Sequence, residues 1–168
     1  MRVLELGCGT GGLLAQLKPS YGVGVDFSEQ MIEVAKRNHG DLEFMIGDVE
    51  EDSFISDLEG PFDYIVLSDA IGYLDDIECV FRNLRKISSS HTRLVVSYYS
   101  HLWEPVLALA EGIGRKMPQP GVNFLSSSDI TNLLYLAGFE VVSTEWRQLI
   151  PKRLLGLGTL VNRYLGTL

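Results

Sequence analysis

The chain has 168 residues, of which 46% are hydrophobic and 21% are charged. This balance is typical of one globular domain with a real core, and it excludes a disordered chain. The formal net charge of −8 argues against a nucleic-acid partner, because phosphate binding needs clustered lysine and arginine.

Cysteine, histidine and hydropathy patterns indicate the compartment of the protein and whether it binds metal or enters a membrane. Cys8 and Cys79 form no C-x-x-C pair, which predicts free thiols in a reducing, cytoplasmic compartment. The histidines are scattered without metal-ligand spacing, so we expect no metal. The chain shows no signal peptide, and its apolar stretches are only strand-sized, so we expect no membrane insertion.

Short apolar runs alternate with helical patterns along residues 1–99. We expect strands at 2–6, 21–26, 42–46, 62–67 and 93–98, and helices at 12–18, 28–37 and 75–87. This alternation predicts a doubly wound α/β fold, Rossmann-like, with a mostly parallel sheet and helices on both faces. Ligands of such sheets bind at the carboxyl ends of the strands, where the strand order reverses.

The pattern changes after the fifth predicted strand. Residues 100–127 form a long excursion with a helical piece at 105–113, and we expect it to lie on the substrate side of a single domain, 1–168. A helix is predicted at 129–137, a sixth strand at 139–146 and a helical tail at 153–168. That tail mixes leucines with basic residues, a pattern that would suit a membrane surface or a partner chain. Its three glycines make it a poor isolated helix, so we expect it to pack on its own sheet or on a missing strand.

A glycine-rich loop, GCGTGG at residues 7–12, follows the first predicted strand. It fits the dinucleotide pattern G-x-G-x-x-G. Such a bare backbone, followed by a helix N-terminus, suits either a pyrophosphate or the carboxylate of a methionine group. The glycines alone therefore leave NAD and S-adenosylmethionine (SAM) both open.

Residues outside the loop favour SAM. A Glu5 carboxylate buried against the loop would repel a pyrophosphate but tolerate an ammonium and a sulfonium. Asp26 ends the second strand, where a carboxylate can accept both hydroxyls of a ribose, and Ser28 is placed to cap the next helix instead of it. Asp48 and Val49 follow the third strand, where they could meet an adenine. The chain also has little room for the second half of a dehydrogenase.

Four motifs in order carry a resemblance to a known family. ELGCGTG, GVGVDFSEQMIEVAKR, FMIGDVE and FDYIVLSDAIGYLDD resemble the motif set of class I SAM-dependent methyltransferases of the small-molecule type, over residues 1–99. Relative to that fold, the chain is expected to lack the helix before the first strand and the last strand. LVVSYYSHLWEPVLALAEGIGRKMPQP and FLSSSDITNLLYLAGFEVV resemble modules that accompany sugar- or cell-envelope-modifying enzymes.

The resemblance implies a set of cofactor-binding positions. The glycines would pass under the methionine part, Asp26 would hold the ribose, and Met31 would pack on the adenosine or else belong to the core. Asp48 would contact the adenine or else be a solvated turn residue, and the main chain at Ser68 would meet the ammonium. The full set is Glu5, Gly7, Cys8, Gly9, Gly11, Asp26, Phe27, Met31, Asp48, Val49 and Ser68.

Candidates for the acceptor side come from two stretches. Tyr73 stands where the family often has histidine, and His101 follows the fifth strand between aromatic residues. His101 and Tyr73 are the candidates for a base, and the alternative for His101 is an ordinary surface histidine. Tyr73, Tyr99 and Trp103 would line a small-molecule pocket, or else the rings near His101 pack the excursion onto the sheet.

The predicted function is methyl transfer from SAM to an oxygen or nitrogen of a small molecule, with a sugar or a cell-envelope precursor among the candidates. The alternatives are a non-catalytic SAM- or nucleotide-binding module of a larger polypeptide, and an NAD-binding dehydrogenase domain.

Overall fold

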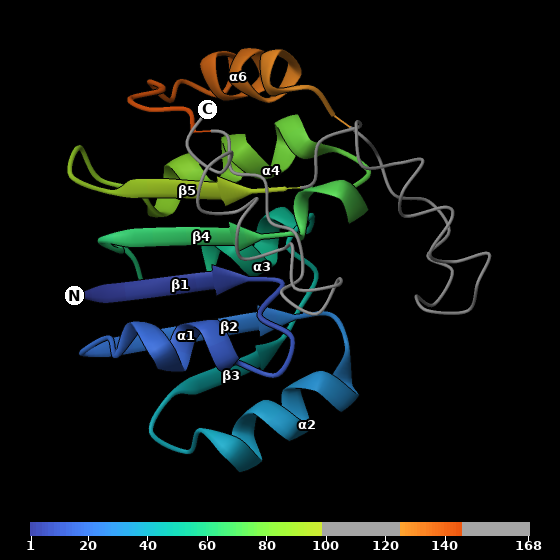
Figure 1. Cartoon of the computed structure of the whole chain (residues 1–168), viewed down its shortest axis with the longest axis vertical. Helices are drawn as coiled ribbons and strands as arrows, with labels where there is room; N and C mark the ends of the chain where they lie inside the picture. Colours follow the sequence, from blue (N-terminus) through green and yellow to red (C-terminus); the bar gives the residue numbers. More distant parts are fainter. Residues whose placement is uncertain (99–124, 146–168) are drawn as a thin grey trace, which may run out of the picture.

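The structure, a computed structural model, describes residues 1–98 and 125–145. Five strands form one parallel sheet in the order β3-β2-β1-β4-β5 (Figure 1). The strands are β1 (Arg2–Leu6), β2 (Tyr21–Asp26), β3 (Glu43–Ile46), β4 (Tyr64–Ser68) and β5 (Arg93–Ser97). The predicted class of fold is confirmed.

The order of the strands places a switch point beside β1. The chain runs outward from β1 through β2 to β3, and then returns to the other side of β1 as β4. Leu4 of β1 is paired with Val23 of β2 and with Ile65 of β4. The loop that leaves the carboxyl end of β1 therefore lies where the strand order reverses, the usual ligand position in such sheets.

Helices cover both faces of the sheet because its strands carry apolar side chains on both sides. One cluster of buried residues joins Val3 and Val66 of the sheet to α1 (Gly12–Leu17) and α2 (Glu29–Asn38). A larger cluster joins the opposite side of the sheet to α3 (Asp52–Ser56), α4 (Ile77–Leu84) and α6 (Ser127–Leu136). Figure 1 shows α6 beyond α4, at the β5 end of the sheet.

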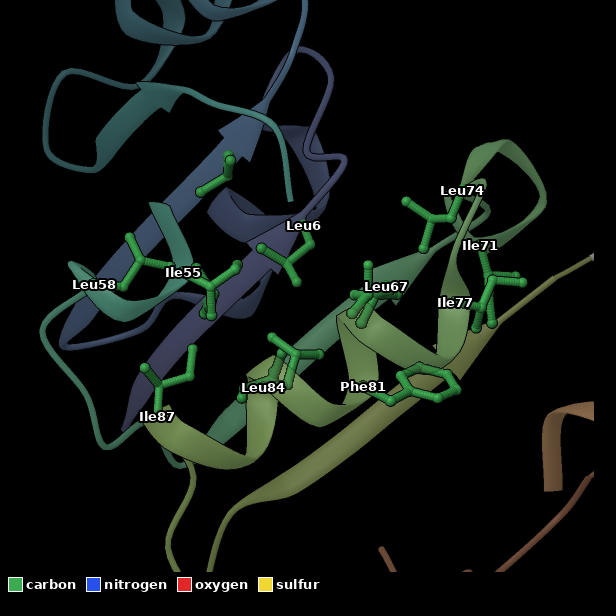
Figure 2. Close-up of a cluster of buried hydrophobic side chains, with 14 of the residues drawn as sticks. Leu6, Ile55, Leu58, Leu67, Ile71, Leu74, Ile77, Phe81, Leu84 and Ile87 are labelled. Carbon is green, nitrogen blue, oxygen red and sulfur yellow. The ribbon is translucent and has the colours of Figure 1, made fainter. Parts of the chain in front are cut away.

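The larger cluster holds α4 against the sheet. Leu6 and Leu67 come from β1 and β4, Phe81 and Leu84 come from α4, and Ile55 comes from α3 (Figure 2). Two short 3₁₀ turns flank α4 in the chain, η1 (Ile71–Tyr73) before it and η2 (Arg85–Ile87) after it. No helix within 1–98 or 125–145 has both the length and the apolar character that a membrane span requires.

The expected elements differ from the observed ones in four places, one of which is the unexpected 3₁₀ turn η1. The predicted sixth strand at 139–146 is wrong over 139–145, which carries no strand pairing. There, Phe139 N–H donates to Leu134 O (2.9 Å) and closes the end of α6, while Val142 is 76% exposed. The short helix α3 was not expected, and the long helix expected at 75–87 divides into α4 and η2.

The remaining helices and strands begin or end within a few residues of their predicted bounds. The helical piece at 105–113, the tail at 153–168 and nearly all of the 100–127 excursion lie outside the described residues. The expectation of a single domain, 1–168, stays a prediction.

Candidate cofactor site

The glycine-rich loop folds back on the end of β2. Gly7 N–H and Cys8 N–H both donate to Val25 O, at 2.8 and 3.0 Å. The φ angles of Gly7, Gly9 and Gly11 are 73°, 52° and 76°, the left-handed region that side chains disfavour. The loop thus bends tightly at the carboxyl edge of the sheet.

The absence of a side chain has a different consequence at Gly7 than at Gly9. A Cβ on Gly7 would lie 2.6 Å from Ala70 Cβ, so the missing side chain lets the loop pack against the segment after β4. Among the residues that the structure describes, a Cβ on Gly9 would meet nothing within 4 Å. With respect to these residues, the loop backbone at Gly9 therefore faces open space and can be approached by a ligand.

Asp26 ties the loop to β2 and to the helix that follows. It is buried at the last position of β2, where Oδ2 accepts from Gly9 N–H (2.8 Å) and Oδ1 from Ser28 N–H (2.9 Å). The capping of α2 falls to Ser28, whose hydroxyl accepts from Met31 N–H (3.4 Å), as the sequence predicted. Each carboxylate oxygen has further lone pairs, so Asp26 can accept two more donors such as ribose hydroxyls.

Glu5 lies behind the loop and is 3% exposed. Its Oε2 accepts from Leu14 N–H (3.0 Å) in the first turn of α1. Burial raises the pKa of Glu5 to about 7. The hydrogen bond from Leu14 N–H lowers this pKa, and the charge of Asp26 raises it further. Because a neutral form is well populated near pH 7, repulsion by Glu5 excludes a pyrophosphate less firmly than the sequence suggested.

Cys8 lies between the loop and the sheet. Its Sγ would be 2.9 Å from a Cβ on Gly24, so it fills the space that this glycine leaves in β2. Burial raises the pKa of the thiol to about 12, with the Glu5 and Asp26 charges adding to it, so the thiol stays neutral. Both Cys8 and Cys79 are free, and Cys8 contributes its backbone N–H and its packing to this site.

Two exposed apolar side chains follow Asp26 in the chain. Phe27 is 81% exposed, and Met31 is also exposed, so the core alternative for Met31 is wrong. On the next strand, Gly47 N–H donates to Asp26 O (3.2 Å) and the exposed Asp48 accepts from Glu50 N–H (2.9 Å). Asp48 is thus a turn residue at the rim, and Val49 packs on the larger core cluster.

The end of β4 forms the other side of the site. Ser68 Oγ and Ser97 Oγ lie 3.2 Å apart, and Asp69 N–H donates to Ser97 O (3.0 Å). Asp69 has a φ of 56°, and desolvation raises the pKa of its carboxyl group. Asp69 was assigned no role from the sequence. Its position directly after β4 could have marked it as a residue of the carboxyl edge. Tyr73 is exposed in η1, on the same edge of the sheet.

The structure therefore brings the loop, Asp26, Phe27, Met31, Asp48 and Ser68 to one edge of the sheet, where strands β1 to β4 end. His101, Tyr99 and Trp103 lie outside the described residues. A cavity of about 520 Å³ lies at the opposite edge, lined by η2 and the segments before β4 and β5, with Lys86 and Ser88 among its residues. Lys86 pairs with Asp52 and Ser88 Oγ donates to Leu84 O (2.7 Å), so these polar groups already have partners.

A parallel sheet with a glycine turn at its switch point, and a carboxylate at the end of the neighbouring strand, defines a Rossmann-like α/β domain. The chain belongs to the methyltransferase domain family, whose model matches residues 1–144. By family and fold it is a class I methyltransferase domain, and this class implies the use of SAM.

Two curated relatives illustrate the sequence similarity. The chain is 34% identical over 107 residues to malonyl-[acyl-carrier protein] O-methyltransferase of Bacillus cereus, covering 60% of this chain and 38% of that protein. It is 28% identical over 164 residues to demethylmenaquinone methyltransferase of Thermotoga maritima, covering 83% of this chain and 70% of that protein. The chain spans 38% and 32% of the length of the malonyl-[acyl-carrier protein] O-methyltransferases of B. cereus and Bacillus anthracis.

Two solved structures show the same fold. An S-adenosylmethionine-dependent methyltransferase from Mesorhizobium loti matches with a TM-score of 0.70 at 18% identity, covering 99% of this chain and 86% of that one. A SAM-dependent methyltransferase from T. maritima, described as a possible histamine N-methyltransferase, matches with a TM-score of 0.65 at 27% identity, covering 83% and 64%.

Proposed function

We propose that this chain binds SAM at the carboxyl edge of its sheet and transfers the methyl group to an oxygen or nitrogen of a small molecule. The observation that carries the proposal is the pairing of Asp26 with Gly9. A buried carboxylate with lone pairs to spare lies one hydrogen bond from a loop backbone that faces open space. This pairing occurs in a chain of the methyltransferase domain family.

The residues at the edge fit the parts of SAM. Asp26 would accept the ribose hydroxyls, and each such charge-assisted hydrogen bond contributes roughly 1.5–3 kcal/mol. The exposed side chains of Phe27 and Met31 offer apolar surface to the adenine, with Asp48 and Val49 at the rim. The loop backbone and the end of β4 at Ser68 would hold the amino-acid end.

When bound, SAM supplies an electrophilic methyl group on a sulfonium sulfur. The protein then has to hold the acceptor oxygen or nitrogen close to that carbon and exclude water from it. Effective molarity of this kind removes roughly 7–11 kcal/mol of barrier. A carboxylic acid or phenol acceptor needs little base catalysis, whereas an alcohol needs a proton acceptor, for which Tyr73 and His101 remain the candidates.

The relatives favour oxygen as the acceptor atom. Five of the six relatives are named O-methyltransferases: three for malonyl-[acyl-carrier protein], one for juvenile hormone acid and one for magnesium-protoporphyrin. The sixth is named for demethylmenaquinone. A panel of carboxylic acids, quinols, phenols, sugars and amines, supplied with radiolabelled SAM, would test the acceptor class.

Calorimetry tests the cofactor first. SAM and S-adenosylhomocysteine should bind to the full chain, and NAD should not. Binding of NAD in place of SAM would contradict the proposal. Tight SAM binding without labelling of any acceptor would favour a non-catalytic binding module.

Replacing the ribose-binding carboxylate provides the sharper test. Asp26→Ala should weaken SAM binding at least ~tenfold, because about 1.4 kcal/mol corresponds to that factor and two charge-assisted bonds are lost. Asp41→Ala, which removes an exposed aspartate between α2 and β3, is the matched control and should bind SAM normally. Circular dichroism confirms that both variants are folded. Unchanged affinity in folded Asp26→Ala would remove the assignment of the ribose site.

A further inference from the structure

Glu5 belongs to β1, but its carboxyl group caps the helix α1. The N-cap of α1 is Gly11, which has no side chain to accept a hydrogen bond. Glu5 Oε2 accepts from the N–H of Leu14, the third residue of that helix, at 3.0 Å. Glu5, a buried strand residue, thus takes the place of the missing side-chain cap. Its hydrogen bond to Leu14 N–H therefore fixes the first turn of α1 and the loop before it.

The groups around Glu5 bring no fixed positive charge among the described residues. Its register partners are Gly24 on β2 and Val66 on β4. The rest of this face is an apolar cluster of Val3, Cys8, Leu14, Ile32, Ala35, Phe44 and Val66. Asp26 is the charged neighbour, and the Cys8 thiol stays neutral because burial raises its pKa to about 12.

His39 is a further titratable side chain close to the loop, besides Glu5, Asp26 and Cys8. Its ring carbon Cδ2 would be 3.2 Å from a Cβ on Gly11, and its ring lies against Phe44, with 6.4 Å between the centroids. His39 is also the C-cap residue of α2, where its backbone N–H donates to Ala35 O. Proton exchange at this site therefore has several candidate groups, among them Glu5, His39 and the desolvated Asp69, and the experiment has to separate Glu5 from the others.

Burial near a like charge leaves Glu5 only partly ionised in the free protein. Burial raises its pKa to about 7, with Asp26 contributing, although the hydrogen bond from Leu14 opposes the shift. A cation brought close to the loop would favour the ionised form of the carboxyl group. Ionised Glu5 would make the stronger, charge-assisted hydrogen bond to Leu14 N–H and firm the first turn of α1.

We propose that Glu5 is a proton-linked positioning residue: as the cationic end of SAM settles on the glycine loop, Glu5 gives up its proton and holds the first turn of α1 more tightly. The inference rests on the proposed function, because it needs SAM at this edge. The proton released passes to the buffer. By linkage, a ligand whose binding releases a proton binds more tightly as the pH rises.

Calorimetry in buffers of different ionisation enthalpy measures the protons exchanged per SAM bound. With the full chain between about pH 6 and pH 8, we expect net proton release, and an affinity that rises by up to ~tenfold per pH unit on the acid side. S-adenosylhomocysteine lacks the sulfonium charge and should release fewer protons.

Two variants assign the proton. Glu5→Gln keeps an oxygen acceptor for Leu14 N–H but cannot ionise, so its binding should lose the proton release and the matching pH dependence. His39→Gln removes another candidate and should release protons as the unmodified chain does. The amino group of the ligand titrates equally in all three proteins, so their differences isolate the side chains.

Infrared difference spectra of the unmodified chain supply a test that needs no variant. Adding SAM near pH 6.5 should remove a protonated carboxyl band, and Glu5→Gln should lack that change. Binding without proton release, proton uptake, or release that His39→Gln abolishes would each overturn the inference. Failure to bind SAM at any pH would overturn the proposed function instead, so the two failures are distinguishable.

Discussion

At the scale of single residues, Gly7 and Gly9 have different roles in one loop: Gly7 is needed for packing, and we propose that Gly9 is needed for ligand binding. Both have a left-handed backbone, which costs a non-glycine residue roughly 1–2 kcal/mol. Gly7 additionally packs against Ala70, where a Cβ would approach to 2.6 Å, whereas a Cβ on Gly9 would meet none of the described residues within 4 Å. The two positions therefore respond differently to the same added methyl group.

We expect Gly7→Ala to lower the free energy of unfolding by roughly 2–5 kcal/mol, the sum of backbone strain and overpacking. Gly9→Ala should cost only about 1–2 kcal/mol but weaken SAM binding at least ~tenfold, because its methyl group enters the binding crevice. Urea unfolding and calorimetry check the two effects. Equal destabilisation by both, with SAM affinity intact in Gly9→Ala, would contradict this division of roles.

The candidate site shows which residues can be predicted from a sequence. Asp26 could be found because the adjacent Ser28 accounts for the helix cap and leaves the carboxylate for another task. The partner of Glu5 could not, because the contact between Glu5 and Leu14 exists only once α1 packs on the sheet. Its raised pKa follows from the same burial, which no spacing along the chain reveals.

At the scale of elements, α4 begins at a side-chain cap that Asp76 supplies and the preceding Asp75 does not. Asp76 Oδ1 accepts from Cys79 N–H (2.9 Å) at the start of this helix. Asp75, one residue earlier, is exposed and carries the same charge. The pair separates the cap from the general effect of acidic residues near a helix N-terminus.

Asp76→Ala should therefore lower the free energy of unfolding by about 1 kcal/mol, the usual contribution of an N-cap. Asp75→Ala, the matched control, should change it by less than about 0.5 kcal/mol. Urea denaturation followed by circular dichroism measures both. A loss of equal size in the two variants would assign the effect to charge and not to the cap.

The predicted elements failed where pairing or packing decides the structure. Residues 139–145 have strand-like composition, but a strand exists only with a partner, and in the described part of the chain the sheet ends at β5. The helix α3 was missed because its five residues are too few to show a period, although Ile55 is fully buried under the sheet. The existence of α4 was predicted because its own apolar stripe determines it, although the predicted helix was longer than the observed one and included η2.

At the scale of the whole molecule, the two edges of the sheet have different tasks. The carboxyl edge collects the loop, Asp26 and the end of β4, while the amino edge is occupied by structural contacts. There the Arg2 guanidinium lies 4.4 Å from the ring centroid of Tyr21, and Asp63 accepts from Arg2 N–H (2.7 Å). The class of fold and the functional edge follow from strand alternation alone, because a parallel sheet places its switch point at the ends of its strands.

The stability of the whole molecule should depend on pH through Glu5. Its pKa is about 7 in the folded chain against an ordinary 4.5, so folding holds a proton that the unfolded chain releases between these values. The stabilisation is therefore complete below about pH 4.5 and is lost as the pH rises through 7, by about 3 kcal/mol in all. Glu5→Gln keeps the acceptor for Leu14 N–H without this titration.

Relative to the unmodified chain, Glu5→Gln should gain about 3 kcal/mol in free energy of unfolding between pH 4.5 and pH 8. Taking the difference between the two proteins cancels the titration of every other carboxyl group. Urea denaturation at several pH values measures this difference, with Glu33→Gln, an exposed change on α2, as the control that should show no trend. A difference that stays constant with pH would mean that Glu5 ionises normally, and that the carboxyl group behind the loop carries its charge throughout.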